Sequence, residues 1–226
     1  MNEIYQKVKV VLVSCEDKTG LVNNEENNLL PPRGILGYFE EIEPETLFIS
    51  SGGTYLLLKE NNFNVKSIEE YTESPQMKNG LVKSIDFKVH ASILAQENKE
   101  DIEFISSNNL LNFDVVITNF LNIYLDNIDL ISNFDQLEKY RIKIDVGGPL
   151  MCMTASKAFT NTLLLTSPKD YVSVIKDMRK NFDTTTLKLR VKLMKKSSKL
   201  LTSYLKNIND LYEKINVDMI AKERGE

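Results

Sequence analysis

Short runs of apolar, largely β-branched residues recur along the chain and predict the strands of a buried sheet. The runs at 8–14, 46–51, 112–119 and 161–167 are rich in apolar residues over most of their length, and a minor run covers 65–68. Strands that are covered on both faces show such runs, whereas a sheet with one face in water alternates apolar and polar positions. The pattern therefore predicts the strands of a mainly parallel sheet.

Segments with helical periodicity separate these strands, and the chain is expected to be helical from residue 169 onward. Helices are predicted at 35–42, 55–61, 91–98, 150–159, 169–181 and 187–215. In the last segment, apolar side chains recur at steps of three and four residues, which marks one buried face. Alternating strands and helices predict an α/β fold, with residues 1–168 as the α/β domain and 169–226 as a helical extension packed on it.

Polar and glycine residues form three turns that predict a ligand site at one edge of the sheet. CEDKTG at 15–20 and SGGT at 51–54 follow strands, and DVGGP at 145–149 opens a helix. Open α/β sheets bind ligands at the carboxyl ends of their strands, and a glycine turn that opens a helix directs backbone N–H groups at an anion. For residues 51–54, a turn required only for packing is the alternative.

The stretch from 71 to 94 differs from the core segments around it. It begins with turn residues and then carries, within eight positions, Lys83, Ser84, Asp86, Lys88 and the chain's only histidine, His90. It follows neither a period of two nor one of 3.6, and such clustering of titratable groups among turn residues is typical of loops that hold ligands. We expect this stretch to form part of the site.

Composition limits the classes of partner and the cellular compartment that we expect for this protein. The 32 acidic and 28 basic residues give a net charge of −4, which offers no argument for nucleic acid or an anionic membrane surface as a partner. Cys15 and Cys152 fit no metal spacing, so a reducing cytoplasm is expected. A single histidine supports no metal site, and no apolar segment approaches the roughly 20 residues that cross a bilayer. We expect a cytoplasmic protein without a metal or cofactor.

Several segments match, in the same order, those of one enzyme family. They are EDKTGLV at 16–22, SSGGT at 50–54, the stretch 71–94, a strand that ends at Asn119, IDVGGPLMCMTASK at 144–157 and a carboxyl-terminal segment that begins TTLKLRVKLMKK. In these segments the chain resembles the IMP cyclohydrolase domain of the bifunctional purine enzyme AICAR transformylase/IMP cyclohydrolase. The resemblance covers nearly the whole chain and implies a methylglyoxal-synthase-like fold. A transformylase-like domain is not expected.

The resemblance also implies a pocket for a nucleotide-like substrate, in which a formamido-carboxamide is dehydrated to close a ring. The family's catalytic groups fall on Lys83, Asp145 and Lys157. A lysine ammonium beside a carboxylate fits the proton transfers and the developing oxygen charge of that reaction. The expected substrate-binding positions are Asp17, Lys18, Thr19, Ser51, Gly52, Gly53, Thr54, Ser84, Asn119 and Val146.

Some positions of the family's pattern are replaced in this chain. A phosphate-binding arginine has become Leu81, and the loss of its bidentate contacts disfavours a phosphorylated ligand. The other replacements are Asp86 for a histidine, Leu121 for a catalytic tyrosine, Met153 for an arginine and Glu16 for a serine. Tyr124 is close in sequence to the lost tyrosine, so Tyr124 and Asp86 are additional candidates for the site.

Each of the following candidate residues also has a purely structural explanation. Lys83 and Lys157 fit solvated surface lysines, and Asp145 fits a side chain that caps the helix after it. For His90 we expect a half-buried side chain with a hydrogen-bond partner, and for Cys152 a small buried side chain.

The expected function is that of a diverged cyclohydrolase-like enzyme. It would carry out a cyclodehydration, or the reverse ring-opening hydrolysis, on an amide-bearing small molecule similar to a purine precursor. A non-catalytic nucleotide-binding or regulatory module that kept the fold is the alternative. Partners considered are a second copy of the chain or a partner enzyme, not nucleic acid or a membrane. The basic run from Lys188 to Lys206, which includes Arg190, is expected to be a solvated helix face, with docking to an acidic partner as the alternative.

Overall fold

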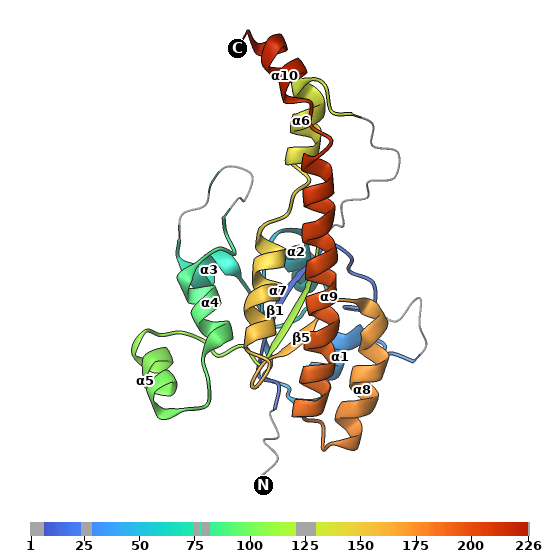
Figure 1. Ribbon diagram of the computed structural model, residues 1–226. Coiled ribbons are helices and arrows are strands. Elements are labelled where there is room, and N and C mark those ends of the chain that lie inside the picture. The colour runs from blue at the N-terminus through green and yellow to red at the C-terminus, as the bar shows by residue number, and fades with distance from the viewer. Residues whose placement is uncertain (1–6, 24–28, 75–76, 78–81, 121–129, 226) are drawn as a thin grey trace.

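A five-stranded parallel sheet forms the centre of the computed structural model, which describes residues 7–23, 29–74, 77, 82–120 and 130–225. The strand order is β3-β2-β1-β4-β5, and each neighbouring pair is parallel. The strands are β1 (Val10–Cys15), β2 (Leu47–Ser50), β3 (Val65–Ser67), β4 (Val115–Asn119) and β5 (Leu163–Leu165). The predicted α/β class and parallel sheet are confirmed (Figure 1).

Successive residues of a strand enter different hydrophobic clusters, one on each face of the sheet. Val11 and Val13 of β1 belong to the first cluster and Leu12 to the second, because side chains alternate along a strand. The first cluster includes residues of α1 (Gly34–Ile42), α8 (Tyr171–Lys180) and the start of α9 (Leu187–Tyr212). The second includes residues of α3 (Ile68–Thr72), α4 (Phe87–Leu94) and α7 (Gly147–Lys157). Helices on both faces of the sheet give the expected three layers.

Helix α9 is 26 residues long and contributes to more than one core. Leu189 and Leu193 pack in the first cluster. Further along the helix, a third cluster consists of Ile131, Tyr204, Leu211 and Ile220, with partly buried side chains of α6 (Phe134–Arg141) packed against it. α9 therefore connects the sheet to a small cluster at the far end of the molecule, where α6 and α10 (Val217–Arg224) lie (Figure 1). None of the helices in the described part of the chain is long and apolar enough to cross a membrane.

Helix boundaries differ from the prediction mainly where a polar cap determines them. α4 begins at Phe87, ahead of the predicted start at residue 91, because the Asp86 carboxylate accepts the Lys88 N–H at 2.7 Å. α7 begins at Gly147 rather than residue 150. The last predicted helix ends at Tyr212, and α10 follows as a separate helix. Three further helices were not predicted. α3 begins after a capping box at Ser67, and α5 (Lys99–Ser107) and α6 each begin after an asparagine cap, at Asn98 and Asn133.

Arg190 is an exception to the predicted solvated basic face of α9. Its side chain is only 2% exposed. Nε donates to the Phe159 carbonyl at 3.1 Å, Nη2 to the Thr160 carbonyl at 2.7 Å, and Nη1 to the carbonyl and hydroxyl of Thr185. Arg190 thus connects the start of α9 to the segment after α7, whereas the lysines of the run are exposed.

Candidate functional site

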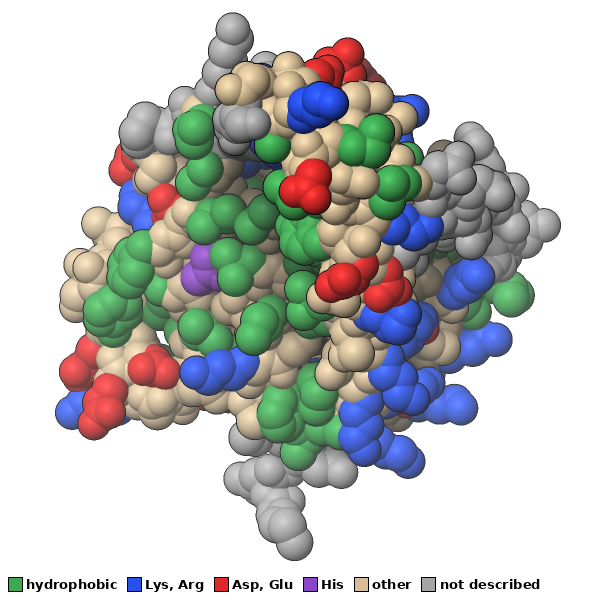
Figure 2. Space-filling model, turned by 45° about the horizontal axis from the view of Figure 1, so that its top comes forward, with side chains coloured by type: hydrophobic (Ala, Val, Ile, Leu, Met, Phe, Trp, Pro, Cys, Tyr) green, Lys and Arg blue, Asp and Glu red, His purple; other side chains and the backbone are tan. Residues whose placement is uncertain are grey.

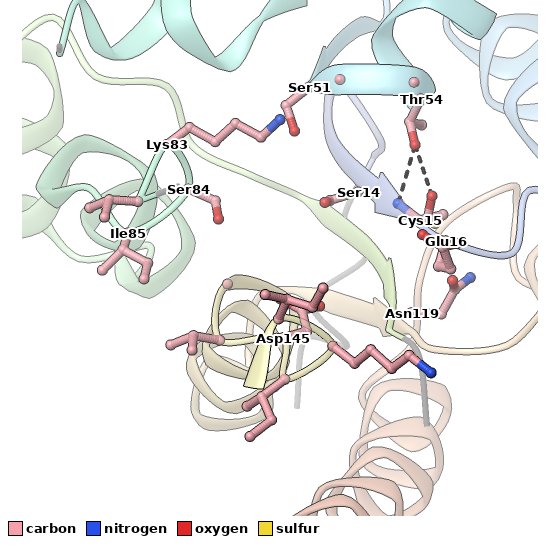
Figure 3. A pocket seen from close by; sticks show the side chains of 18 of the residues that line it. Ser14, Cys15, Glu16, Ser51, Thr54, Lys83, Ser84, Ile85, Asn119 and Asp145 are labelled. Carbon is pink, nitrogen blue, oxygen red and sulfur yellow. Dashed lines mark hydrogen bonds between the residues drawn. The ribbon is translucent and has the colours of Figure 1, made fainter. Parts of the chain in front are cut away.

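A pocket of about 570 Å³ lies at the carboxyl ends of β1, β2 and β4, the edge of the sheet where the polar turns were expected to meet. Its walls come from the segment after β1, the first turn of α2 (Gly52–Glu60), the segment before α4, and the residues around the start of α7 (Figure 3). It is lined by Ser14, Cys15, Glu16, Lys18, Ser51, Gly52, Gly53, Thr54, Val82, Lys83, Ser84, Ile85, Asn119, Ile142, Lys143, Ile144, Asp145, Val146 and Gly147.

Asn119 holds the segment after β1 in place. Its Oδ1 accepts the Asp17 N–H at 2.8 Å, and its Nδ2 donates to the Asp17 carbonyl at 2.8 Å. The Asp17 carboxylate in turn accepts the Thr19 N–H at 3.0 Å. Asp17 and Thr19 therefore shape the loop and do not line the pocket. Lys18 does line it, and its Nζ donates to the Glu16 carbonyl at 3.2 Å.

Two lysines from distant segments converge on the first turn of α2. Gly52 adopts a positive φ of 55°, and a Cβ at this position would lie 3.1 Å from Lys83 Nζ. A Cβ at Gly53 would lie 3.9 Å from Lys18 Cε. Thr54 Oγ1 donates to the carbonyl of the last β1 residue at 3.0 Å, so this hydroxyl fixes the turn to the sheet. Since a helix N-terminus attracts negative charge, the two ammonium groups and this turn suit an anionic group.

The segment that carries Lys83 and Ser84 joins two walls of the pocket. Figure 3 shows the Lys83 side chain directed toward Ser51. On the other side, a Cβ at Gly147 would lie 2.4 Å from Ser84 Oγ, so Ser84 packs closely against the first residue of α7. Val82, just before Lys83, has a φ of 72°. A β-branched residue in the left-handed region is strained, and such strain clusters at functional sites.

Asp145 lies just before α7, and its carboxylate faces the first turn of that helix. Oδ1 accepts the Gly148 N–H at 3.2 Å. Burial raises the pKa of the Asp145 carboxyl above its ordinary value, and the charge of Glu16 raises it further, while the N–H groups of Gly148 and Gly147 act in the opposite direction. The carboxyl is thus more readily protonated than an exposed aspartate. The structure shows the hydrogen bond to the following helix that was the structural explanation for Asp145. It also shows that Asp145 lines the pocket.

Lys157 is not brought to this pocket. It is an exposed residue in the last turn of α7, whereas Asp145 precedes the first turn. With a rise of 1.5 Å per residue, the ten steps from Gly147 to Lys157 span roughly 15 Å, more than a lysine side chain can bridge. Lys157 therefore does not line the pocket with Asp145, and its catalytic role stays a prediction.

Other candidates have structural partners outside the pocket. Besides capping α4, Asp86 accepts a hydrogen bond from Ser74 Oγ at 2.5 Å. His90 is half-buried, as expected, and its Nδ1 lies 2.9 Å from Thr154 Oγ1. Burial lowers the pKa of His90, and Figure 2 shows the histidine (purple) among hydrophobic side chains. Cys152 is fully buried, also as expected.

The remaining expectations concern Met153, residues outside the described part, and metals. Met153 is 66% exposed on α7 and does not line the pocket. Leu81, Leu121 and Tyr124 lie outside the described residues. Across the described ranges, no group of three or more His, Cys, Asp and Glu side chains could hold a metal ion.

The residues between α6 and α7 were missing from the predicted site. Ile142, Lys143 and Ile144 line the pocket next to Asp145. The sequence before the glycine turn indicates these three pocket residues only weakly, because its alternating basic and apolar residues, RIKID, fit a strand equally well. Lys143 adds a third ammonium group to the pocket lining.

Comparison with known proteins finds relatives among the PurH proteins. No family model matches the chain. The bifunctional purine biosynthesis protein PurH of Clostridium botulinum (strain Langeland) is 34% identical over 198 residues, which cover 87% of this chain and 36% of that protein. PurH of Clostridium perfringens (strain SM101) is 37% identical over 157 residues, which cover 69% of this chain and 30% of that protein. The chain thus spans about a third of the length of these curated relatives.

A solved structure supports the fold independently. The crystal structure of ForH superposes with a TM-score of 0.69 and 23% sequence identity, and the match covers 92% of this chain and all of the ForH chain. At this identity the match shows the fold alone, and it agrees with the methylglyoxal-synthase-like architecture implied by the sequence motifs. The identity to PurH, over 87% of this chain, shows that the chain is a homologue of part of PurH, in agreement with the resemblance of its motifs to the IMP cyclohydrolase domain.

Proposed function

We propose that the chain is an IMP cyclohydrolase-like enzyme that closes a ring by cyclodehydration, or opens it by hydrolysis, in an amide-bearing substrate similar to a purine precursor. The observation that carries the proposal is that one pocket combines Lys83 with Asp145, a carboxyl group whose pKa is raised by burial. Such a perturbed group, in a cleft whose lining also carries lysines, is a candidate for acid–base chemistry. The relationship to PurH supports the reaction class.

The proposed ring closure moves protons and expels one water molecule. An amide nitrogen attacks a formyl carbon and forms a C–N bond, while its proton is lost and the formyl oxygen becomes a hydroxyl. Dehydration then removes that hydroxyl together with an N–H proton and leaves a C=N bond. In this scheme Asp145 accepts the proton from the attacking nitrogen, and the Lys83 ammonium stabilises the oxygen and donates a proton to it. Ring opening follows the same steps in reverse.

The charges of the pocket favour an anionic substrate. Lys18, Lys83 and Lys143 outnumber Glu16 and Asp145 among the charged side chains of the described lining. Two of the lysines lie over the first turn of α2, where the helix dipole adds to their effect. We place the anionic end of the substrate at this turn beside Lys18, the reacting amide near Asp145, and the formyl oxygen between them on the Lys83 side.

The test is a turnover assay with matched variants. Formamido-imidazole-carboxamide ribotide is incubated with the purified chain, and ring closure is followed by absorbance. Lys83→Ala and Asp145→Asn are each expected to lower kcat by about 100-fold or more, the range for loss of a general acid or base. Lys66→Ala, which removes an exposed lysine on β3 away from the pocket, is the control and should retain the activity.

Three results would count against parts of the proposal. A folded wild-type chain without turnover of this ribotide excludes IMP synthesis and leaves a different amide as the substrate. A nucleotide that raises the melting temperature but is never transformed points to a binding module instead. Once a substrate is known, unchanged kcat in both pocket variants would refute the assigned roles.

A further inference from the structure

Tyr204 of α9 reaches the main chain of Asp145 from behind the pocket. The side chain is buried, with 1% of its surface exposed. Its hydroxyl accepts the Asp145 N–H at 2.8 Å and donates to the Asp145 carbonyl at 2.8 Å. One side-chain atom therefore satisfies both backbone groups of the residue that carries the pocket's partly buried carboxylate, although the two residues are 59 positions apart in the sequence.

Packing keeps the Tyr204 ring in this position. The ring of Phe120, which follows the last residue of β4, meets it edge-on, with centroids 4.9 Å apart and an interplanar angle of 68°. Phe120 also leaves no room at the start of α7, since a Cβ on Gly148 would lie 3.1 Å from Phe120 Cβ and 2.5 Å from Asp145 Oδ2. Leu211 and Ile220 belong to the same cluster as Tyr204. The end of β4, the start of α7 and the third cluster therefore meet behind Asp145.

We propose that Tyr204 is a positioning residue that fixes the Asp145 carboxylate against the first turn of α7. The role in catalysis rests on the proposed function of Asp145. A group that exchanges a proton in the transition state must be held within a fraction of an ångström, and a displacement of about 1 Å costs on the order of 100-fold in rate. Tyr204 supplies this constraint through the backbone of Asp145 and does not line the pocket.

The test variant is Tyr204→Phe, which removes the hydroxyl and keeps the ring. It is compared with Tyr171→Phe, which removes another buried tyrosine hydroxyl, one with no hydrogen-bond partner among the described residues. Both are assayed well below their melting temperatures. For Tyr204→Phe we expect kcat to fall about tenfold or more while KM stays within about twofold, because Lys18 and the α2 turn, where we place the anionic end, do not contact Tyr204. Tyr171→Phe should leave both parameters unchanged.

A second readout does not depend on turnover. The Asp145 amide donates to the Tyr204 hydroxyl, so its hydrogen exchange, followed by NMR, should be about tenfold faster or more in Tyr204→Phe, with the Val116 amide of β4 unchanged. If the wild-type chain turns over neither the ribotide nor any other amide-bearing substrate, the proposed function fails, and this exchange rate alone decides whether Tyr204 holds residue 145. Unchanged Asp145 exchange, or an unchanged kcat in an active enzyme, would overturn the positioning role.

Discussion

Asp145 lies among groups that act on its pKa in opposite directions. Burial raises this pKa, the negative charge of Glu16 raises it further, and the backbone N–H groups at the start of α7 lower it. Glu16 is also a position where the chain departs from the family's serine. The pKa of Asp145, and with it the pH range of the proposed reaction, therefore depends in part on this replacement.

Substitution of Glu16 by glutamine tests this dependence. Without the neighbouring negative charge, the ionised form of Asp145 is less disfavoured and its pKa falls. If the reaction needs ionised Asp145 as a base, the acidic limb of the kcat profile should move to lower pH, with higher activity than wild type on that limb. Glu100→Gln removes an exposed carboxylate on α5, outside the pocket, and should leave the profile unchanged. A limb that stays in place, or moves upward, would contradict this account.

Site residues that lie in or next to a single turn could be predicted from the local sequence. Lys18, Ser51 to Thr54 and Asp145 lie at the pocket because each sits next to a strand end or a helix start that the apolar pattern predicts. Lys83 lies there in the stretch where titratable groups cluster among turn residues. Lys157 could not be placed in this way, because its position depends on the length and direction of α7. For Tyr204 the sequence predicts only a place on the buried face of the last long helix. Its contact with Asp145 joins residues 59 positions apart and leaves no signal in the local sequence.

At the scale of elements, the apolar runs identified the strands well because strands buried on both faces tolerate few polar residues. α5 and α6 were missed. Each is short, and neither contains a fully buried residue, so no apolar stripe marks it. Their only local signals were the asparagine caps. Arg190 shows the opposite difference: the basic run predicts a solvated side chain, but Arg190 is buried.

The three backbone carbonyls that Arg190 satisfies make it a structural link between α9 and the end of α7. Arg190→Met keeps much of the volume but leaves the carbonyls of Phe159, Thr160 and Thr185 without this donor. The Thr185 carbonyl is buried, and an unpaired buried group costs about 1–3 kcal/mol, whereas the carbonyls of exposed Thr160 and partly buried Phe159 are closer to water. We therefore expect urea unfolding to show a loss of about 1–3 kcal/mol. Lys188→Met, at an exposed position two residues earlier, should change stability by less than about 0.5 kcal/mol. Equal effects of the two variants would argue against the link.

At the scale of the whole molecule, each wall of the pocket depends on a different part of the core. The sheet and the first cluster support the β1 loop and α2, the second cluster supports α4 and α7, and the third cluster supports Asp145 through Tyr204. Helix α9 contributes to the first and the third. Substitutions that disrupt the first cluster and those that disrupt the third should therefore change the rate of the proposed reaction differently. This difference should remain even when both lower the free energy of unfolding by a similar amount.

Leu211→Ala and Leu189→Ala, both on α9, test this difference. Leu211 is 2% exposed in the third cluster, and Leu189 is 3% exposed in the first. Each substitution removes the same buried atoms and should cost about 2–5 kcal/mol in the free energy of unfolding. Under conditions where both proteins are folded, Leu211→Ala should also lower kcat and speed exchange of the Asp145 amide, because it loosens the packing that holds Tyr204. Leu189→Ala should leave both near wild type, since the cavity it creates lies beside the sheet. If both variants lower kcat equally, the third cluster has no special relation to Asp145, and the effect on activity reflects general loss of stability.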